Sequence, residues 1–234
     1  MTSFYRRFVR DYMRYKDYIQ CAGAQLVAAI REESLRIAPE KGGEYYSLHI
    51  RRGDFQYKEV KISAEDIFKN LHHPNGTAII GPGSVVYIST DDPDGICKDC
   101  HVGRKSCDVL EEPKPVGCGG IDPSWRGFQD HLVSGWKLLF LSNFTLKGIL
   151  NGVNPNVLGM VESIACSRGK VFAGTYYSTF TGYIHRLRGY HGIAEESYYH
   201  SNHHVFELKN KKSVGHGFWR EWRAGWTDDG GELI

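Results

Sequence analysis

Two adjacent arginines in the stretch His49-Ile50-Arg51-Arg52-Gly53-Asp54-Phe55 are the first residues that could hold a phosphate. They follow a short apolar run, and Gly53 permits a tight turn after it. Because neighbouring side chains on extended backbone point to opposite sides, we expect one arginine to face a crevice and the other to turn to the protein, toward Asp54. The planar guanidinium of the arginine that faces the crevice suits a phosphate. An ordinary surface pair with a salt bridge is the alternative.

A second polar stretch, Ser89-Thr90-Asp91-Asp92-Pro93, also follows an apolar run. Asp91 could accept a hydrogen bond from a sugar or a base. The simpler interpretation is a turn, because an aspartate before a proline favours one. Both interpretations stay open for Asp91, and Asp92 fits the turn better.

The longest of these stretches, residues 172–181, combines a strand, a glycine turn and a hydroxyl-rich helix start. The helix has an apolar face that we expect to pack on a sheet, formed by Phe180, Tyr183, Ile184 and Leu187. Ser178 and Thr179 then lie at the helix start, where free backbone N–H groups and the positive end of the helix dipole attract an anion. Simple N-capping, which needs one hydroxyl, is the alternative.

Apolar periodicity and turn residues predict strands and helices that alternate along most of the chain. The expected strands cover 45–50, 85–89, 136–141 and 170–173, and the expected helices cover 4–38 in two pieces, 63–71, 145–150, 155–165 and 178–190. Such alternation is typical of α/β folds, in which a parallel sheet is covered on both faces. Ligands of these sheets bind at the carboxyl ends of the strands, where all three polar stretches fall. An arginine and a helix start at one edge can grip a diphosphate, so we expect no metal at this site.

The composition excludes several other classes of protein. The 234 residues include 29 Lys and Arg against 27 Asp and Glu, and the net charge of +2 gives no sign of a nucleic-acid partner. No apolar run reaches the roughly 20 residues of a membrane span, and no signal-peptide pattern opens the chain. The histidines at 72, 73, 200, 203 and 204 lack the ordered spacing of metal ligands, and we expect them at the surface.

Most of the cysteines fall within a loop insertion at about 93–127, namely Cys97, Cys100, Cys107 and Cys118. This segment has few large apolar residues, so we expect two disulfides to hold it, with their pairing left open. A zinc knuckle is the less favoured alternative, because the spacings match no standard pattern. We expect Cys166 to be a free, packed thiol. The sequons Asn75-Gly76-Thr77 and Asn143-Phe144-Thr145 favour the secretory route.

The three stretches, taken in order, resemble the motifs of the GDP-fucose protein O-fucosyltransferase family, in its plant-like branch. The resemblance covers residues 45–192, and its longest part is Cys166-Ser167-Arg168-Gly169-Lys170-Val171-Phe172-Ala173-Gly174-Thr175-Tyr176-Tyr177-Ser178-Thr179-Phe180-Thr181-Gly182-Tyr183-Ile184. It implies the C-terminal, Rossmann-like, donor-binding half of a GT-B glycosyltransferase. It also implies an inverting reaction that uses GDP-fucose as donor substrate and needs neither metal nor further cofactor.

The resemblance also implies roles for single residues. Arg51 corresponds to the arginine that holds the donor β-phosphate and aids departure of the leaving group, and Asp54 to an acidic residue that orients the arginine or the fucose. The His49 backbone lies on the guanine side. The donor-binding residues at the other two stretches are Asp91 and then Ser178, Thr179 and Phe180. One departure from the animal enzymes is Lys170, which stands where they carry an aspartate that reads the base.

The resemblance further predicts how the chain is organised and where it acts. Residues 1–44 are expected to be a helical segment that links to a missing N-terminal half, 45–194 the nucleotide-sugar-binding domain, and 195–234 a tail. The expected location is the lumen of the Golgi or endoplasmic reticulum, and the expected acceptor is a protein or a glycan. The alternatives are a transferase that uses another 6-deoxysugar nucleotide, such as UDP-rhamnose, and an inactive nucleotide- or carbohydrate-binding fragment.

Overall fold

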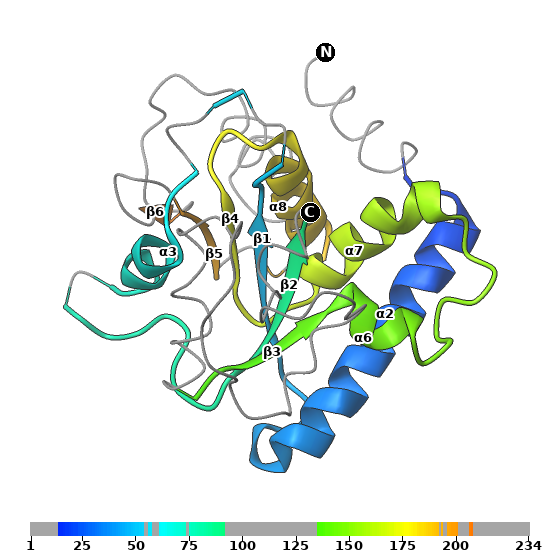
Figure 1. The fold of residues 1–234 in the computed structure, drawn as a ribbon, viewed down its shortest axis with the longest axis horizontal. Helices are drawn as coiled ribbons and strands as arrows, with labels where there is room; N and C mark the ends of the chain where they lie inside the picture. Colours follow the sequence, from blue (N-terminus) through cyan, green and yellow to red (C-terminus); the bar gives the residue numbers. More distant parts are fainter. Residues whose placement is uncertain are drawn as a thin grey trace, which may run out of the picture.

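A computed structural model describes residues 14–53, 56–57, 61–73, 75–91, 135–191, 193, 196–200 and 206–207 (Figure 1). The helices are α2 (Asp17–Ile37), α3 (Ala64–Asn70), α6 (Leu141–Thr145), α7 (Leu158–Ser167) and α8 (Thr179–Tyr190), with short 3₁₀ turns at Pro39–Lys41 and Pro155–Val157. The strands are β1 (Tyr46–Ile50), β2 (Val85–Thr90), β3 (Lys137–Phe140), β4 (Phe172–Thr175), β5 (Ser197–His200) and β6 (Phe206–Glu207). Cys97 to Cys118 lie outside the described residues, as does the first part of the expected N-terminal helix.

The strands form one sheet in the order β3-β2-β1-β4-β5-β6. β1 to β5 run parallel to one another, and β6 pairs antiparallel with β5. The chain therefore moves outward from β1 through β2 to β3 and then returns to the other side of β1 to form β4 and β5. This is the strand order of a Rossmann-like α/β fold, and the parallel sheet is the one that the alternation of elements predicts.

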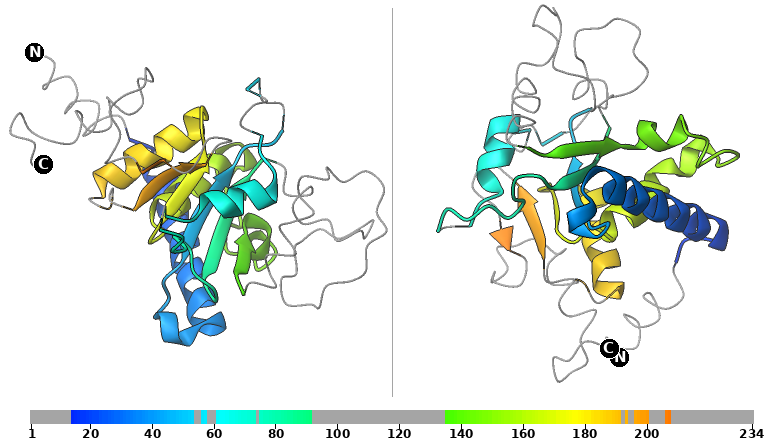
Figure 2. Two further views of the ribbon diagram at one scale, coloured as in Figure 1. Left: turned by 90° about the vertical axis from the view of Figure 1, so that its left-hand side faces the viewer. Right: turned by 90° about the horizontal axis from the view of Figure 1, so that it is seen from below.

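Helices cover both faces of the sheet, because successive side chains of each strand point to opposite faces. In β1, Leu48 and Ile50 face a core that includes α3, while Ser47 and His49 face the side of α7 and α8. The larger core lies among α2, α7, α8 and the sheet, and it buries Leu26, Tyr87, Ile164, Phe172 and Ile184. The two further views show α3 on one side of the sheet and α2, α7 and α8 on the other (Figure 2).

Arg188, in the last turn of α8, is a structural residue. Its guanidinium is fully buried and donates to the backbone oxygens of Ser167, Gly169, Lys170 and Glu196 and to Ser197 Oγ. These carbonyls follow α7 and precede β4 and β5. One charged side chain thus satisfies acceptors that the end of a helix leaves without donors. Burial nevertheless lowers the pKa of Arg188 to about 10.

Three sequence-based expectations about elements need correction. The predicted helix at 145–150 is wrong: α6 begins directly after β3 and ends at Thr145, and a turn follows in which Gly148 has a φ of 76°. The predicted strand at 170–173 is displaced by two residues, because β4 covers Phe172–Thr175. The segment beyond 195, in which no period is evident, supplies β5 and β6.

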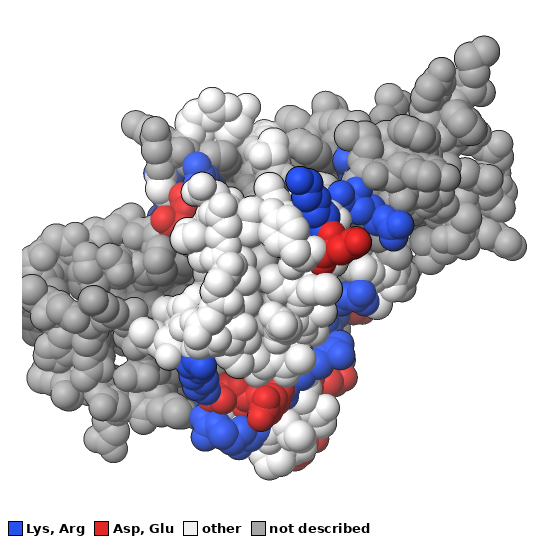
Figure 3. Space-filling view, turned by 90° about the vertical axis from the view of Figure 1, so that its right-hand side faces the viewer, with Lys and Arg blue, Asp and Glu red and all other residues white. Residues whose placement is uncertain are grey.

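The face that looks out over α2 and α7 carries its charged side chains mainly at the rim, where Lys and Arg lie beside Asp and Glu (Figure 3). The segment from Gly148 to Val161 on this side contains no charged residue. One charged residue of α2, Glu33, pairs with both Arg36 and Lys147. In the described part of the chain, this face shows no basic stripe of the kind that nucleic-acid binding needs. Among the described residues, every helix is too short or too polar to cross a membrane.

Candidate functional site

The candidate site lies where the strand order reverses, between the carboxyl ends of β1 and β4. The chain leaves these two neighbouring strands toward opposite faces of the sheet, first to α3 and then to α8. The loops part there and leave a crevice in which open α/β sheets bind their ligands. Arg51 directly follows β1, and the turn into α8 directly follows β4. The structure thus brings the first and third polar stretches of the sequence together.

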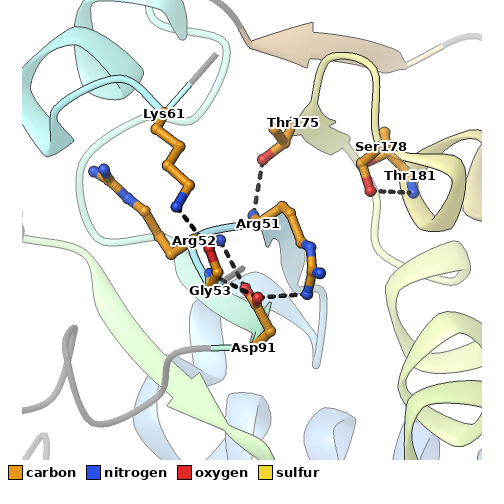
Figure 4. A network of polar contacts seen from close by, with 8 residues as sticks. All are labelled: Arg51, Arg52, Gly53, Lys61, Asp91, Thr175, Ser178 and Thr181. Atoms are coloured by element: carbon orange, nitrogen blue, oxygen red, sulfur yellow. Dashed lines mark hydrogen bonds and ion pairs between the residues drawn. The ribbon is translucent and has the colours of Figure 1, made fainter. Parts of the chain in front are cut away.

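Asp91 holds the backbone after β1 in place (Figure 4). Its carboxylate accepts hydrogen bonds from the backbone N–H groups of Arg52 and Gly53, both at 2.7 Å, and from Arg51 Nη1 at 2.5 Å. Residue 53 has to be glycine for this contact, because an added Cβ would lie 2.4 Å from Asp91 Oδ2. Asp91 is thus more than a turn residue, since it orients the arginine loop from the neighbouring strand β2.

The two arginines separate as the alternation of side chains predicts. Arg51 stays at the surface of the crevice, where 34% of its side chain is exposed. Arg52 turns inward and is 6% exposed, and its guanidinium donates to the backbone oxygen of Ile62. The inward arginine therefore has a carbonyl partner, and the expected partner, Asp54, lies outside the described residues. Lys61 adds a hydrogen bond to the Gly53 oxygen at 2.6 Å.

Thr175 joins the ends of β1 and β4. Its hydroxyl accepts from the Arg51 N–H at 2.9 Å and donates to the His49 oxygen at 3.3 Å. His200, at the end of β5, donates from Nε2 to the same oxygen at 3.0 Å. His200 is 1% exposed, so the expectation of a surface histidine is wrong. Among the described residues its Nδ1 has no hydrogen-bond partner.

The His49 side chain connects β1 to the start of α8. Its Nδ1 lies 2.7 Å from Thr181 Oγ1, and its ring packs on Phe180 with 4.7 Å between the centroids. Burial lowers the pKa of His49 to about 3, with the charge of His200 and then of Arg51 adding to the effect, so the imidazole is neutral at physiological pH. Gly174 lets α8 approach this closely, since an added Cβ would lie 2.4 Å from Thr181 Cγ2.

The start of α8 shows both features that its sequence leaves open as alternatives, an N-cap hydroxyl and free backbone N–H groups for an anion. Ser178 is the N-cap, because its Oγ accepts from the Thr181 N–H at 3.4 Å, while Thr179 is exposed. Within the described part of the chain, the backbone N–H groups of Thr179 and Phe180 have no acceptor. These are the groups that a helix start offers to an anion. The Ser178 hydroxyl itself is occupied by capping.

Tyr177, just before the N-cap, has a φ of 62°. This left-handed conformation costs a residue with a side chain about 1–2 kcal/mol. Its ring contacts Tyr57 from the loop after β1, with 5.0 Å between the centroids. Backbone strain of this kind concentrates at binding sites, where the surrounding structure enforces it.

Glu162 is a titratable group near the site that sequence reasoning missed. It lies on α7, and its Oε1 accepts from Tyr87 Oη at 2.9 Å, with a further hydrogen bond to Ser89. Burial raises its pKa to about 7, despite these hydrogen bonds. A single glutamate on a helical face carries no sequence signal. Only the pairing of Ser89 with His49 in the sheet brings it near the crevice.

Lys170 has no part in the site. It precedes β4, at the amino end of the sheet, and its Nζ pairs with Glu44 at 2.8 Å. The structure therefore does not bring position 170 to the crevice.

Cys166 is a free, fully buried thiol, as predicted. Asp54 and the four clustered cysteines lie outside the described residues, so their expected roles and disulfides remain predictions. In a comparison with known proteins, no family model matches the chain and no curated protein resembles it significantly.

Proposed function

We propose that this chain is the donor-binding, C-terminal half of a GT-B glycosyltransferase, which transfers fucose from GDP-fucose to a serine or threonine hydroxyl of a protein. The observation that carries the proposal is the meeting of Arg51 and the start of α8 at the switch point of the sheet. The resemblance of the three motifs supplies the identity of the sugar and the base.

The crevice offers two sources of positive charge to a diphosphate. Asp91 fixes the Arg51 guanidinium from one side, and the N–H groups of Thr179 and Phe180 point out of the helix start on the other. Hydrogen bonds within the protein hold both groups in place, so little reorganisation is needed as charge builds up on the leaving diphosphate. Arg51 then stabilises the departing β-phosphate while the acceptor oxygen attacks the sugar from the opposite side. The group that deprotonates this acceptor is assigned to the N-terminal half.

The test is the affinity of the purified chain for GDP, measured by calorimetry. Arg51→Ala should weaken GDP binding about tenfold or more, because a hydrogen bond to a charged group contributes about 1.5–3 kcal/mol. In an enzyme that includes the N-terminal half, the same change should slow fucose transfer on the order of 10²–10³-fold. Arg36→Ala is the matched control, since Arg36 is an exposed arginine at the far end of α2. Equal GDP affinity of Arg51→Ala and Arg36→Ala would refute the role of Arg51.

A comparison of donor substrates distinguishes the proposed function from the two alternative functions. GDP-fucose should be hydrolysed or transferred in preference to UDP-sugars. A preference for UDP-rhamnose would indicate a related transferase with another donor. Binding of GDP without any turnover in a complete enzyme would indicate a nucleotide-binding module.

A further inference from the structure

The two sequons of the chain lie in different structural surroundings. Asn75 lies in a tight hairpin turn between α3 and β2, at which His72 and Ala78 form a bridge. The His73 N–H donates to the Thr77 oxygen at 2.8 Å, and Gly76 takes a φ of 81° at the tip. Asn75 and Thr77 are both exposed. The tip of this hairpin, residues 75–77, is therefore exposed.

The Asn75 side chain is arranged so that its amide nitrogen faces outward. Its Oδ1 accepts from the Thr77 N–H at 3.0 Å, which fixes the carboxamide over the turn. Within the described residues, Nδ2 makes no hydrogen bond. A sugar on Nδ2 would therefore replace only solvent, and the turn would keep all its hydrogen bonds.

Asn143 lies in the opposite situation. Its Oδ1 accepts from the Phe140 N–H at 2.7 Å, so the side chain folds back on the carboxyl end of β3. The middle residue of this sequon, Phe144, is 1% exposed, and Thr145 Oγ1 donates to the Ser142 oxygen. A glycan on Asn143 would have to leave the protein from within this short helix. The helix lies at the carboxyl ends of the strands, where the candidate site also lies.

The topology places the Asn75 hairpin at the opposite end of the strands, their amino ends. α3 runs from the carboxyl end of β1 back to the amino end of β2, and the hairpin lies between α3 and β2. A glycan there would point away from the crevice at Arg51. The position is thus compatible with donor binding as well as with folding.

From these observations we infer that Asn75 is the N-glycosylated residue of the two sequons and that Asn143 stays unmodified. The inference rests on the proposed function for the lumenal location, where the modification takes place. The co-substrate is an oligosaccharide carried on a lipid diphosphate. A bond forms between Asn75 Nδ2 and the anomeric carbon of the sugar, the bond from that carbon to the diphosphate oxygen breaks, and the amide releases one proton as the lipid diphosphate departs.

The experiment directs the whole chain to the lumen of a eukaryotic cell with a cleavable signal peptide and maps glycans by mass before and after enzymatic deglycosylation. The wild type should carry one glycan. Asn75→Gln and Thr77→Ala should both remove it, whereas Thr77→Ser, which keeps the sequon, should retain it. Asn143→Gln is the matched control and should leave the glycan in place. A glycan on Asn143, or an unmodified Asn75 in secreted protein, would overturn the inference.

GDP binding by the same secreted protein separates this inference from the proposed function. Glycosylated protein and Asn75→Gln should bind GDP with affinities within about twofold of each other. A glycan on Asn75 in a protein without affinity for GDP would refute the donor role and leave the modification site standing.

Discussion

At the scale of single residues, Asp91 does most to shape the crevice. It accepts hydrogen bonds from two backbone N–H groups and one guanidinium N–H of residues 51–53, although it follows another strand, β2. From the sequence, Asp54 is expected to orient an arginine, and this remains a prediction because Asp54 lies outside the described residues. The contacts of Asp91 with this loop depend on the pairing of β1 with β2, which no local pattern reveals. The inward turn of Arg52, by contrast, follows from strand alternation alone.

Glu162 provides a residue-scale prediction about pH. The pKa of its carboxyl is about 7 in the folded protein against 4.5 ordinarily, so between these values the folded state binds more protons than the unfolded state. Its contribution to stability therefore falls as pH rises through this range. Glu162→Gln cannot ionise and keeps an acceptor for Tyr87. It should raise the free energy of unfolding at pH 8 by about 1–3 kcal/mol and change it little at pH 5. Urea unfolding at both pH values checks this, and an equal effect at both would contradict it.

At the scale of elements, sequence predicts regular helices better than their junctions. Ser63 caps α3 as its spacing from Asp66 indicates, and α8 begins after the expected N-cap, Ser178. The helix expected at 145–150 fails because the chain turns directly from β3 into α6, where Asn143 caps the backbone of Phe140. This cap sets where the helix begins, whereas the apolar pattern predicts a later start. The apolar pattern alone does not show that such a cap forms.

The α8 start leads to an element-scale prediction. Because Ser178 is the N-cap, Ser178→Ala should lower the free energy of unfolding by about 1 kcal/mol, while Ser178→Gly should cost only a few tenths. Thr179→Ala, at an exposed position, should leave stability unchanged. If the backbone N–H groups hold the diphosphate, Ser178→Gly should also retain most of the GDP affinity. Chemical denaturation and calorimetry on the three variants measure both effects, and a strong loss of affinity in a stable Ser178→Gly would show that the hydroxyl itself binds.

At the scale of the whole molecule, the alternation of strands and helices predicts a parallel sheet covered on both faces, and the structure has one. The alternation does not predict that β5 comes from the segment beyond 195. That segment reads Ser197-Tyr198-Tyr199-His200, which is polar and aromatic rather than aliphatic. All four residues are buried, since β5 lies between β4 and β6, and their polar groups find partners such as Arg188 and the His49 oxygen. Only the assembled sheet provides those partners.

We expect the buried histidines to set how the whole fold responds to acid. Burial lowers the pKa of His49 to about 3 and of His200 to about 4, against 6.5 ordinarily. Below pH 6.5 these histidines are therefore protonated in the unfolded chain but stay neutral in the folded protein. Stability should fall as pH falls toward the folded values, by up to about 1.4 kcal/mol per pH unit for each histidine. Protonation of Glu162 raises stability as pH falls, which opposes the histidines, but it is one group against at least two.

We therefore expect the free energy of unfolding to drop by about 2 kcal/mol or more between pH 7 and pH 5, as measured by urea unfolding. His200→Gln keeps a donor for the His49 oxygen and cannot take up the proton, so it should flatten this dependence by the share of one histidine. His73→Gln, at an exposed position in the hairpin, is the control and should leave the slope as it is. Stability that stays constant from pH 7 to pH 5, or an equal slope in His200→Gln and wild type, would show that the buried histidines do not set the acid limit of the fold.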